Sequence, residues 1–478
     1  MFKLHKPYKP AWDQIKAIEQ ILLNFENWYN KLTLLWATWT WKTFTMANII
    51  EKMNLPTLVL SHNKTLAAQL TTEFKWFFPE NAVNYFVSYF NYYQPESYIP
   101  EKDIYIEKDS AINDEIKMYR LATMSNLLSR NDTIIVSSVS AIYGLGTAEL
   151  FYKSSINLEV GSSYNFKKLK KNLLDIQYNP VKGDITAWNF NFLWNMLDIY
   201  SSIENIIYRI HFDEEKVIFI EKKDPITWKQ IWKAEKITIW PATQFIQNME
   251  NLNKILKGIE KEKNERVKYF KKHNELLFAK RIEQKVNYDI KMIKETWFTN
   301  WIENYSRYFE WRNPQEPPQS LFDYFPDEFL LIIDESHITI PQFQAMPFAD
   351  RSRKMNLIDY GFRLPSAMDH RPLFWHELEY MIWIKKKDII KKENKIEWFD
   401  PLVWIEYLDK TLRKKKKAYI LFASATPADY EKQVSWWKII EQIIRPTWLL
   451  DPITYIYPKS WDFSLLEKNL KKWKDTKQ

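Results

Sequence analysis

The apolar positions of the N-terminal segment predict helices and strands in alternation. Residues 11–25 carry apolar side chains at helical spacing, and a strand-like apolar run follows at 32–35. A short polar loop leads to a second helical pattern at 43–53, and the strand-like run 57–61 is followed by a third helical pattern at 63–78. Strands that alternate with helices are typical of an α/β fold, in which helices cover both faces of a parallel sheet.

Three later apolar runs predict further buried strands of the same sheet. They cover residues 133–138, 329–336 and 418–426. Each is short and has no charged residue before its end, as expected of a strand buried on both faces. The predicted sheet therefore continues after long interruptions.

Three segments form these interruptions. Residues 83–112 are rich in Tyr and strand-forming residues and predict an extended hairpin. Residues 157–244 contain short strand-like runs separated by turn residues, which predict a small α+β insert. Residues 246–295 are strongly charged and have helical periodicity, which predicts long packed helices.

The composition changes how several positions must be interpreted. The 478 residues include 6 Gly and 23 Trp, whereas about 7% Gly, or about 33 residues, is usual for a chain of this length. A folded chain needs positive φ at many turns and helix ends, and glycine adopts it most easily. We hypothesise that many Trp positions carry glycine in the protein as its source makes it, through a stop codon reassigned to glycine. A protein that is truly rich in Trp is the alternative.

Other features of the composition exclude whole classes of protein. With 46% apolar residues the chain can bury large cores, and its length predicts two to four domains. The absence of Cys excludes disulfides, Cys-based zinc sites and a thiol nucleophile. The start of the sequence lacks the apolar core of a signal peptide, so we expect a cytoplasmic location. A net charge of +8 is compatible with a polyanionic partner.

The loop before the second helix is the strongest candidate site. If Trp36 and Trp41 are read as glycine, it becomes G-x-x-x-x-G-K-T between a strand and a helix, which is a phosphate-binding loop. Lys42 would neutralise the β- and γ-phosphates, and the Thr43 hydroxyl would coordinate Mg²⁺. Indole rings at 36, 39 and 41 would fill the space of the phosphates. An aromatic cluster ahead of a helix is the alternative interpretation.

Further candidates lie at other predicted strand ends and on the first predicted helix. Asp334 and Glu335 follow an apolar strand; Asp334 would hold Mg²⁺, and Glu335 would orient and deprotonate the attacking water. A capped strand end would explain the pair equally well if it stood alone. Gln14 could read an adenine edge, and a Ser-Ala-Thr triplet at 424–426 could link the nucleotide site to a nucleic-acid track, although a surface Gln and a simple turn are the alternatives. The candidate nucleotide-binding residues are Gln14, Trp36, Ala37, Thr38, Trp39, Thr40, Trp41, Lys42, Thr43, Ser424 and Thr426.

The predicted hairpin carries a second kind of candidate site. Its aromatic residues exceed what a small hairpin needs for its own packing, and stacking on nucleic-acid bases contributes roughly 1–3 kcal/mol per base. From composition alone, packing against a neighbouring domain is the favoured interpretation. The residues concerned are Tyr89, Phe90, Tyr92, Tyr93, Tyr98 and Tyr105.

With these residues assembled, the chain closely resembles the UvrB family, the damage-verifying subunits of bacterial nucleotide excision repair. The likeness rests on long strings, among them LSHNKTLAAQL, FVSYFNYYQPESYIP, DYFPDEFLLIIDESH and GFRLPSAMDHRPL. In that family glycine usually stands at the positions of Trp12, Trp36, Trp39, Trp41, Trp188, Trp297, Trp301, Trp311 and Trp448. The resemblance thus supports the reassigned codon independently of composition.

The resemblance implies a superfamily-2 helicase-like motor built on RecA-like P-loop NTPase domains. It divides the chain into a first RecA-like domain (1–156 and 326–455, with the hairpin at about 89–112), a UvrA-interaction domain (157–244), a helical DNA-clasping domain (245–325) and the start of a second, truncated RecA-like domain (456–478). Because the family's second domain completes the ATP site, we expect this chain to bind ATP weakly and to hydrolyse it poorly.

The resemblance also implies a function. The chain would be an ATP- and Mg²⁺-dependent subunit that recognises and verifies DNA damage, inserts the hairpin between the strands of duplex DNA, and passes damaged DNA from UvrA to UvrC. Tyr92 and Tyr93 would become DNA contacts, which reverses the preference from composition. A non-hydrolysing scaffold is the alternative if the Trp residues are real. A transcription–repair coupling translocase is a third possibility, against which the Tyr-rich hairpin argues.

Overall fold

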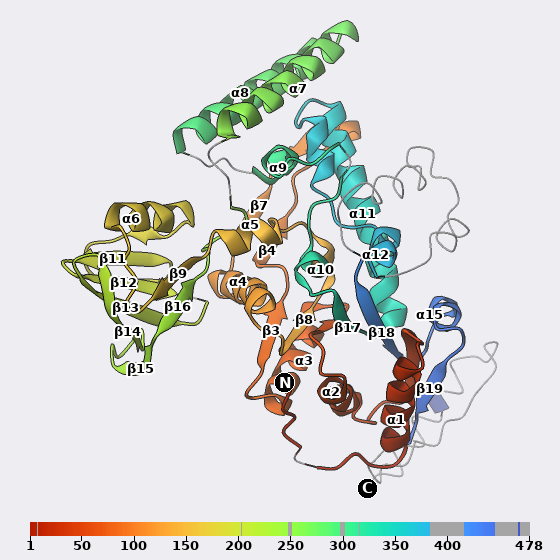
Figure 1. The fold of residues 1–478 in the computed structure, drawn as a ribbon. Coiled ribbons are helices and arrows are strands. Elements are labelled where there is room, and N and C mark those ends of the chain that lie inside the picture. The colour runs from red at the N-terminus through yellow and green to blue at the C-terminus, as the bar shows by residue number, and fades with distance from the viewer. Residues whose placement is uncertain are drawn as a thin grey trace.

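The computed structural model describes residues 1–6, 8–201, 203–246, 251–296, 302–314, 316–382, 415–444 and 467–468 (Figure 1). Its centre is a seven-stranded sheet in which every neighbouring pair is parallel. The strands are, in spatial order, β19 (Ile439–Gln442), β1 (Lys31–Trp36), β18 (Lys417–Ser424), β17 (Glu328–Asp334), β2 (Thr57–Leu60), β8 (Thr133–Ser137) and β3 (Ala82–Phe86). The predicted α/β class with a parallel sheet is confirmed.

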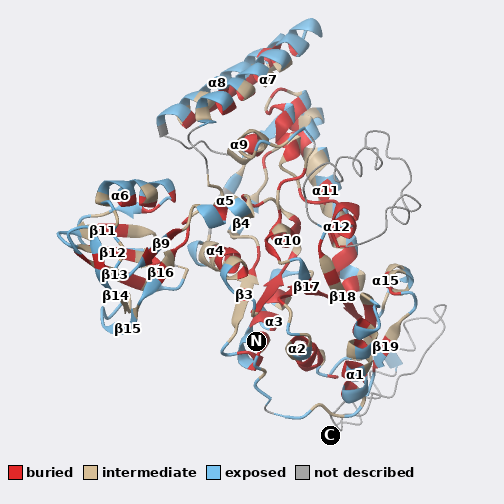
Figure 2. Ribbon diagram, viewed as in Figure 1, coloured by how far each residue is buried: buried red, intermediate tan, exposed pale blue. Residues whose placement is uncertain are grey.

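Helices cover both faces of the sheet, and the strand side chains alternate between them. In β17, Phe329 and Leu331 enter one core while Leu330 and Ile332 enter the other. One face is covered by α1 (Asp13–Glu26), α2 (Lys42–Met53) and α3 (Lys64–Phe77). The other is covered by α4 (Asp114–Ser129), α10 (Leu321–Tyr324), α11 (Ser336–Asp359) and α12 (Trp375–Met381). The buried residues accordingly concentrate along the sheet (Figure 2).

The first insert is a separate small domain, seen at the left of Figure 1. Its main sheet is antiparallel except for the β10–β11 pair, and it packs around a core of its own. The elements are β9 (Ile156–Glu159), α6 (Phe166–Asp175), β10 (Asn179–Pro180), β11 (Asn189–Leu193), β12 (Met196–Ser201), β13 (Ile206–Asp213), β14 (Lys216–Lys223), β15 (Gln230–Ala234) and β16 (Lys236–Ile239). The predicted α+β character of this insert is confirmed, and α5 (Ala148–Lys153) leads into it.

The second insert is a pair of long helices that projects from the top of the molecule in Figure 1. The helices α7 (Leu252–Lys272) and α8 (Leu276–Thr296) pack together through apolar residues such as Ile259 and Ile282, as the charged helical pattern predicts. The short helix α9 (Ser306–Phe309) connects this pair to the main body. Single-turn helices complete the described chain: η1 (Pro100–Lys102), η2 (Val139–Ile142), η4 (Ile302–Tyr305), η5 (Pro365–Asp369) and α15 (Asp429–Val434).

The Tyr-rich segment forms a hairpin in two parts. Its stem pairs β4 (Phe90–Gln94) with β7 (Asp109–Ile112), and its tip pairs β5 (Ser97–Ile99) with β6 (Ile104–Ile106). The predicted start of the hairpin at residue 83 is wrong, because Ala82–Phe86 is the edge strand of the central sheet and pairs in parallel with β8. The helices α4 and α11 and the strand β19 were not predicted.

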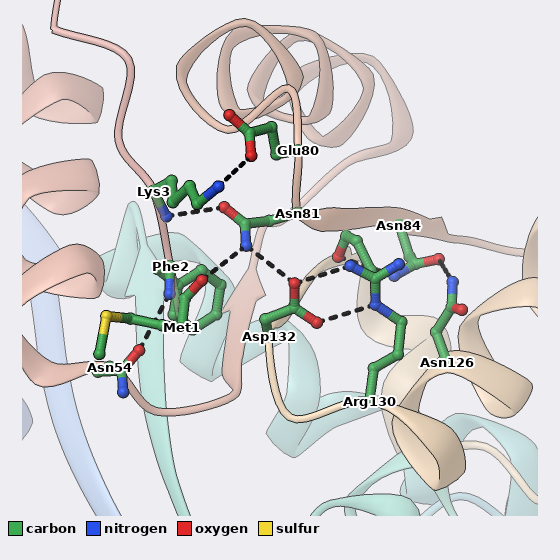
Figure 3. A network of polar contacts seen from close by, with 11 residues as sticks. Met1, Phe2, Lys3, Asn54, Glu80, Asn81, Asn84, Asn126, Arg130 and Asp132 are labelled. Carbon is green, nitrogen blue, oxygen red and sulfur yellow. Dashed lines mark hydrogen bonds and ion pairs between the residues drawn. The ribbon is translucent and has the colours of Figure 1, made fainter.

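The N-terminal residues are tied to the edge of the sheet (Figure 3). Asn81 is the centre of this network: its carbonyl oxygen accepts from the Lys3 backbone N–H at 3.0 Å, and its amide donates to Met1 O at 3.2 Å and to Asp132 Oδ2 at 2.9 Å. Arg130 holds the same Asp132 carboxylate with two hydrogen bonds. One amide side chain therefore joins the N-terminal segment to the loop before β8.

The predicted domain start at 456–478, apart from residues 467–468, lies outside the described residues, as do Trp297, Trp301 and Trp448. Within the described ranges, no helix is both long enough and apolar enough to span a lipid bilayer.

Candidate nucleotide site and hairpin

The predicted phosphate-binding loop connects β1 to α2. Trp41, the residue before α2, has φ 54° and ψ 50°, and Trp39 has φ 70°. The Thr40 hydroxyl donates to Ala37 O at 2.8 Å and closes the loop. A left-handed backbone costs an L-residue about 1–2 kcal/mol but costs glycine almost nothing. The loop thus has the backbone of a glycine-rich turn, while its indole rings at 39 and 41 are exposed.

Three predicted catalytic side chains meet at the carboxyl end of the sheet. The Lys42 Nζ lies 2.7 Å from Asp334 Oδ1 and 2.8 Å from Glu335 Oε1. Asp334 ends β17, and Glu335 has φ 45° and directly precedes α11. The parallel strands β1, β18 and β17 bring the ends of two segments almost 300 residues apart to one edge. The lysine and both carboxylates therefore form one compact cluster.

One buried carboxylate oxygen of this cluster lacks a hydrogen-bond partner within the described part of the chain. Asp334 is fully buried, and burial raises the pKa of its carboxyl while Lys42 opposes the rise. Its second oxygen, Oδ2, has no hydrogen-bond partner among the described residues. A buried carboxylate oxygen without a partner is costly, and oxygen atoms are the ligands that Mg²⁺ prefers. The unpartnered oxygen of Asp334 is therefore a candidate ligand for a divalent cation.

Two glutamine side chains donate hydrogen bonds to the same carbonyl of the phosphate-binding loop. Gln14 is almost fully buried, and its amide donates to Thr40 O at 3.1 Å. Gln442, on the edge strand β19, donates to the same carbonyl at 2.6 Å. In this arrangement the amide of Gln14 positions the loop, rather than being open to an adenine edge. Gln442 was missed by the sequence analysis, because a short edge strand carries no motif.

The predicted Ser-Ala-Thr triplet lies beside the acidic pair. Ser424 ends β18, and its hydroxyl lies 2.7 Å from His337 Nδ1. The same ring nitrogen is 3.8 Å from Glu335 Oε2. The Thr426 backbone N–H donates to Ser424 Oγ at 3.0 Å, which fixes the turn after the strand. A continuous polar path therefore runs from the acidic pair to the triplet, and His337 is a member that sequence analysis did not single out.

The hairpin stem presents aromatic rings to solvent. Tyr92 and Tyr93 are about half exposed, and Phe90 stacks on Tyr93 with ring centroids 4.8 Å apart. Tyr89 lies against Phe90 at 4.4 Å. Lys108 Nζ lies over the Phe90 and Tyr93 rings at 5.5 and 5.4 Å and pairs with a glutamate at 3.1 Å. The stem is thus an aromatic surface with a cation beside it.

The hairpin tip differs, because its tyrosines lie against rings of the main body, although Tyr105 remains 41% exposed. Tyr98 is only 6% exposed and lies against Tyr360 and Phe362 at 4.8 and 4.9 Å. Tyr105 stacks on Phe362 at 4.5 Å, and its hydroxyl donates to Glu96 at 2.6 Å. The predicted DNA contact at Tyr98 does not fit this arrangement, because no face of the ring is open to a base. Tyr98 therefore packs against the main body, as expected from composition, and is not placed to stack on a base.

Comparisons with known proteins agree with this geometry. A family model described as the UvrB interaction domain matches residues 156–245, and the UvrB third helical domain matches residues 250–311. The res subunit of type III restriction enzymes matches residues 7–143. The UvrABC system protein B of Lactobacillus acidophilus is 45% identical over 458 residues, which are 96% of this chain and 62% of that protein. The chain is similar to UvrB proteins over 96% of its length.

Other UvrB relatives give the same result. The proteins of Agathobacter rectalis and Cytophaga hutchinsonii are 44% and 43% identical, each over 96% of this chain. The chain spans 62–64% of the length of these three relatives. The matched UvrB domains coincide with the small α+β domain and the long helical pair, while the helicase-like match contains the phosphate-binding loop and the hairpin.

Proposed function

We propose that this chain is an ATP-dependent DNA damage recognition and verification component of a UvrABC-type nucleotide excision repair system. The observation that carries the proposal is the cluster of Lys42, Asp334 and Glu335 at the carboxyl edge of a parallel sheet, with contacts of 2.7 and 2.8 Å. Nucleotides bind at this edge in α/β proteins. The cofactors we propose are ATP and Mg²⁺.

Each residue of the cluster has a part in the proposed reaction. Lys42 would exchange its carboxylate partners for the β- and γ-phosphates, which releases Glu335 to orient the attacking water and accept its proton. Thr43 and Asp334 would hold Mg²⁺, which neutralises the phosphate charge when it is bound. Gln14 and Gln442 hold the Thr40 carbonyl and so keep the loop in position.

The polar path to Ser424 supports a link between nucleotide and DNA. A change of partner at Glu335 would alter its 3.8 Å contact with His337 Nδ1. Because the Ser424 hydroxyl lies 2.7 Å from the same nitrogen, its position would change as well. Ser424 lies at the end of β18, so a change there reaches the turn that Thr426 closes. This path would report the state of the nucleotide site to the rest of the motor.

The hairpin is the proposed DNA element. The exposed rings of Tyr92 and Tyr93 can stack on bases. The packed tip at Tyr98 would hold the hairpin against the body while one strand passes the stem. UvrA would bind through the small α+β domain, and UvrC would make the incision.

A nucleotide titration tests the proposal. The chain is produced with glycine at 36, 39 and 41, and binding of a fluorescent ATP analogue is measured with Mg²⁺. We expect saturable binding that Lys42→Ala abolishes, and binding without turnover in Glu335→Gln. No binding by the glycine form would refute the proposed ATPase.

A non-hydrolysing scaffold is the second candidate, and one observation favours it. With tryptophan at 36, the indole ring lies 4.1 Å from the Lys42 Nζ, where the phosphates would have to pass. The same titration on the chain with tryptophan retained should show no nucleotide binding. If both forms fail to bind ATP but still bind damaged duplex DNA, the scaffold is correct.

A further inference from the structure

The backbone separates the tryptophans into two groups. Among the described residues, seventeen that are not glycine have positive φ, and ten of them are Trp. Side chains as bulky as indole are rare outliers in this region. The ten, with φ from 51° to 70°, are Trp12, Trp28, Trp39, Trp41, Trp188, Trp194, Trp228, Trp311, Trp436 and Trp437.

Their positions are those at which glycine is normally selected. Trp12 has φ 54° and ψ −131°, which lies outside all three regions allowed to L-residues. Trp194 is the first residue of a two-residue loop between β11 and β12, where one of the favoured turns takes glycine. Trp436 and Trp437 follow the last turn of α15, where a left-handed residue usually ends a helix.

Their side chains make little use of an indole. Nine of the ten are exposed, and Trp194 is 96% and Trp28 87% exposed. Tryptophan is highly buried on average in folded proteins. A residue in a strained backbone persists only where its surroundings compensate, and a ring in solvent supplies no compensation.

Two other tryptophans behave in the opposite way. Trp240 is 7% exposed and stacks on Phe151 with centroids 5.8 Å apart. The Trp375 indole N–H donates to the Tyr430 hydroxyl at 2.8 Å. Neither has positive φ. Each therefore buries its ring or satisfies its only donor, as tryptophans in folded proteins usually do.

Trp36 belongs with the first group on different grounds. Its indole N–H is buried and has no hydrogen-bond partner among the described residues. Its ring lies 4.1 Å from the Lys42 ammonium, beside the loop that Trp39 and Trp41 complete. A buried unsatisfied donor is costly, and glycine at this position would remove both the donor and the obstruction.

We propose that the ten positions with positive φ and position 36 carry glycine in the protein as its own cell makes it, whereas 240 and 375 carry tryptophan. Residues that are all written as Trp would then be encoded by two different codons: a stop codon reassigned to glycine, and the ordinary tryptophan codon. The division between the two groups rests on backbone conformation and packing. Its consequence is that the phosphate-binding loop has no side chains at 36, 39 and 41.

Peptide mass spectrometry of the protein purified from its source cells tests the division position by position. We expect glycine at 12, 28, 194, 436 and 437, and tryptophan at 240 and 375. Tryptophan at any of the first five would overturn the proposal. Glycine at 240 or 375 would overturn the division, because every Trp would then be reassigned regardless of its environment. Neither result depends on whether the protein binds ATP.

Thermal unfolding of recombinant chains gives a second test. We expect a higher Tm when the eleven positions are changed to glycine than in the chain with all tryptophans, and a lower Tm when Trp240→Gly and Trp375→Gly are added. A fall in Tm on the first change would contradict the inference, even if both proteins fold.

Discussion

The phosphate-binding loop and the hairpin stem both expose aromatic rings, but their backbones differ. Tyr92 and Tyr93 lie in a strand, whose extended backbone suits aromatic side chains. Trp39 and Trp41 lie in left-handed turns, at φ 70° and 54°. The exposed rings of the stem are therefore compatible with selection for a surface function, whereas the rings of the loop oppose both the backbone and the site. Exposure of an aromatic ring means little until the backbone that carries it is known.

The largest expected effect is at the loop. In the chain with glycine at 36, 39 and 41, Lys42→Ala removes the cation that would balance the phosphates. From the low turnover expected of this chain, we expect a further fall of about 10²–10³-fold, as when one transition-state donor is lost. Steady-state phosphate release measures it. Tyr92→Ala is the control, because it should leave turnover without DNA unchanged; a Lys42→Ala protein with full turnover would remove the loop from the mechanism.

Sequence patterns could predict the sheet and much of this site, because the strands are marked by apolar runs and the site residues follow those runs in the sequence. Asp334 and Glu335 stand at the end of a strongly apolar strand, and Lys42 follows another such strand through a short loop. Parallel strands must bring such ends to one edge. Gln442 and His337 could not be found in this way. Gln442 acts from a four-residue edge strand, and His337 acts only through its contacts with Ser424 and Glu335.

The hairpin shows the same limit. Residues 83–112 are uniformly rich in strand-forming residues, so the pattern could not show that Ala82–Phe86 joins the central sheet while the hairpin starts at Phe90. Nor could it separate the exposed Tyr92 from the packed Tyr98, because the partners of Tyr98 are more than 250 residues away.

The second prediction tests the contribution of the buried Trp240 ring to stability. Trp240→Gly removes an indole from the core against Phe151. We expect a loss of about 3–5 kcal/mol in the free energy of unfolding, as for other large-to-small changes of aromatic core residues. Urea denaturation followed by circular dichroism measures it. An unchanged midpoint would mean that Trp240 is not a core residue, and the contrast between the two groups of tryptophan would fail.

The third prediction concerns His370, which lies near Glu303, the ion-pair partner of Lys108 on the hairpin stem. Burial, together with the nearby charge of Lys354, lowers the pKa of His370 from its usual value near 6.5 to about 4. The unfolded chain binds a proton below pH 6.5 but the folded chain does not, so stability is full above pH 6.5 and falls as the pH drops towards 4. At 1.36 kcal/mol per pKa unit the loss approaches about 3 kcal/mol.

Unfolding measured at pH 7 and at pH 4.5 checks this expectation. His370→Gln should remove most of the difference between the two pH values, because glutamine does not titrate. If the variant keeps the full pH dependence, other groups carry it. Glu303, whose charge raises the pKa of His370, also pairs with Lys108 of the hairpin stem. Acid should therefore loosen the stem before the phosphate-binding loop.

The fourth prediction tests the stem itself. Tyr92→Ala or Tyr93→Ala should weaken binding to damaged duplex DNA by roughly 1–3 kcal/mol for each stacked base that is lost. Fluorescence anisotropy with a labelled duplex measures the affinity. Tyr152→Ala is the matched control, since Tyr152 is 57% exposed but lies on α5, outside the hairpin. Equal losses in all three variants would show that the stem has no special role in DNA binding.

The smallest expected effect discriminates most sharply between the two kinds of exposed ring. Trp194 and Trp232 are 96% and 69% exposed, but only Trp194 has positive φ, while Trp232 lies in β15. Trp194→Gly should stabilise the fold by about 1 kcal/mol, because it relieves a left-handed backbone. Trp232→Gly should destabilise it by roughly 0.5–1 kcal/mol, because glycine loses more conformational freedom in a strand. Chemical denaturation of the two variants measures opposite signs for the same substitution. If both variants shift in the same direction, ring exposure rather than backbone conformation decides the outcome, and the argument that separates the loop from the stem is lost.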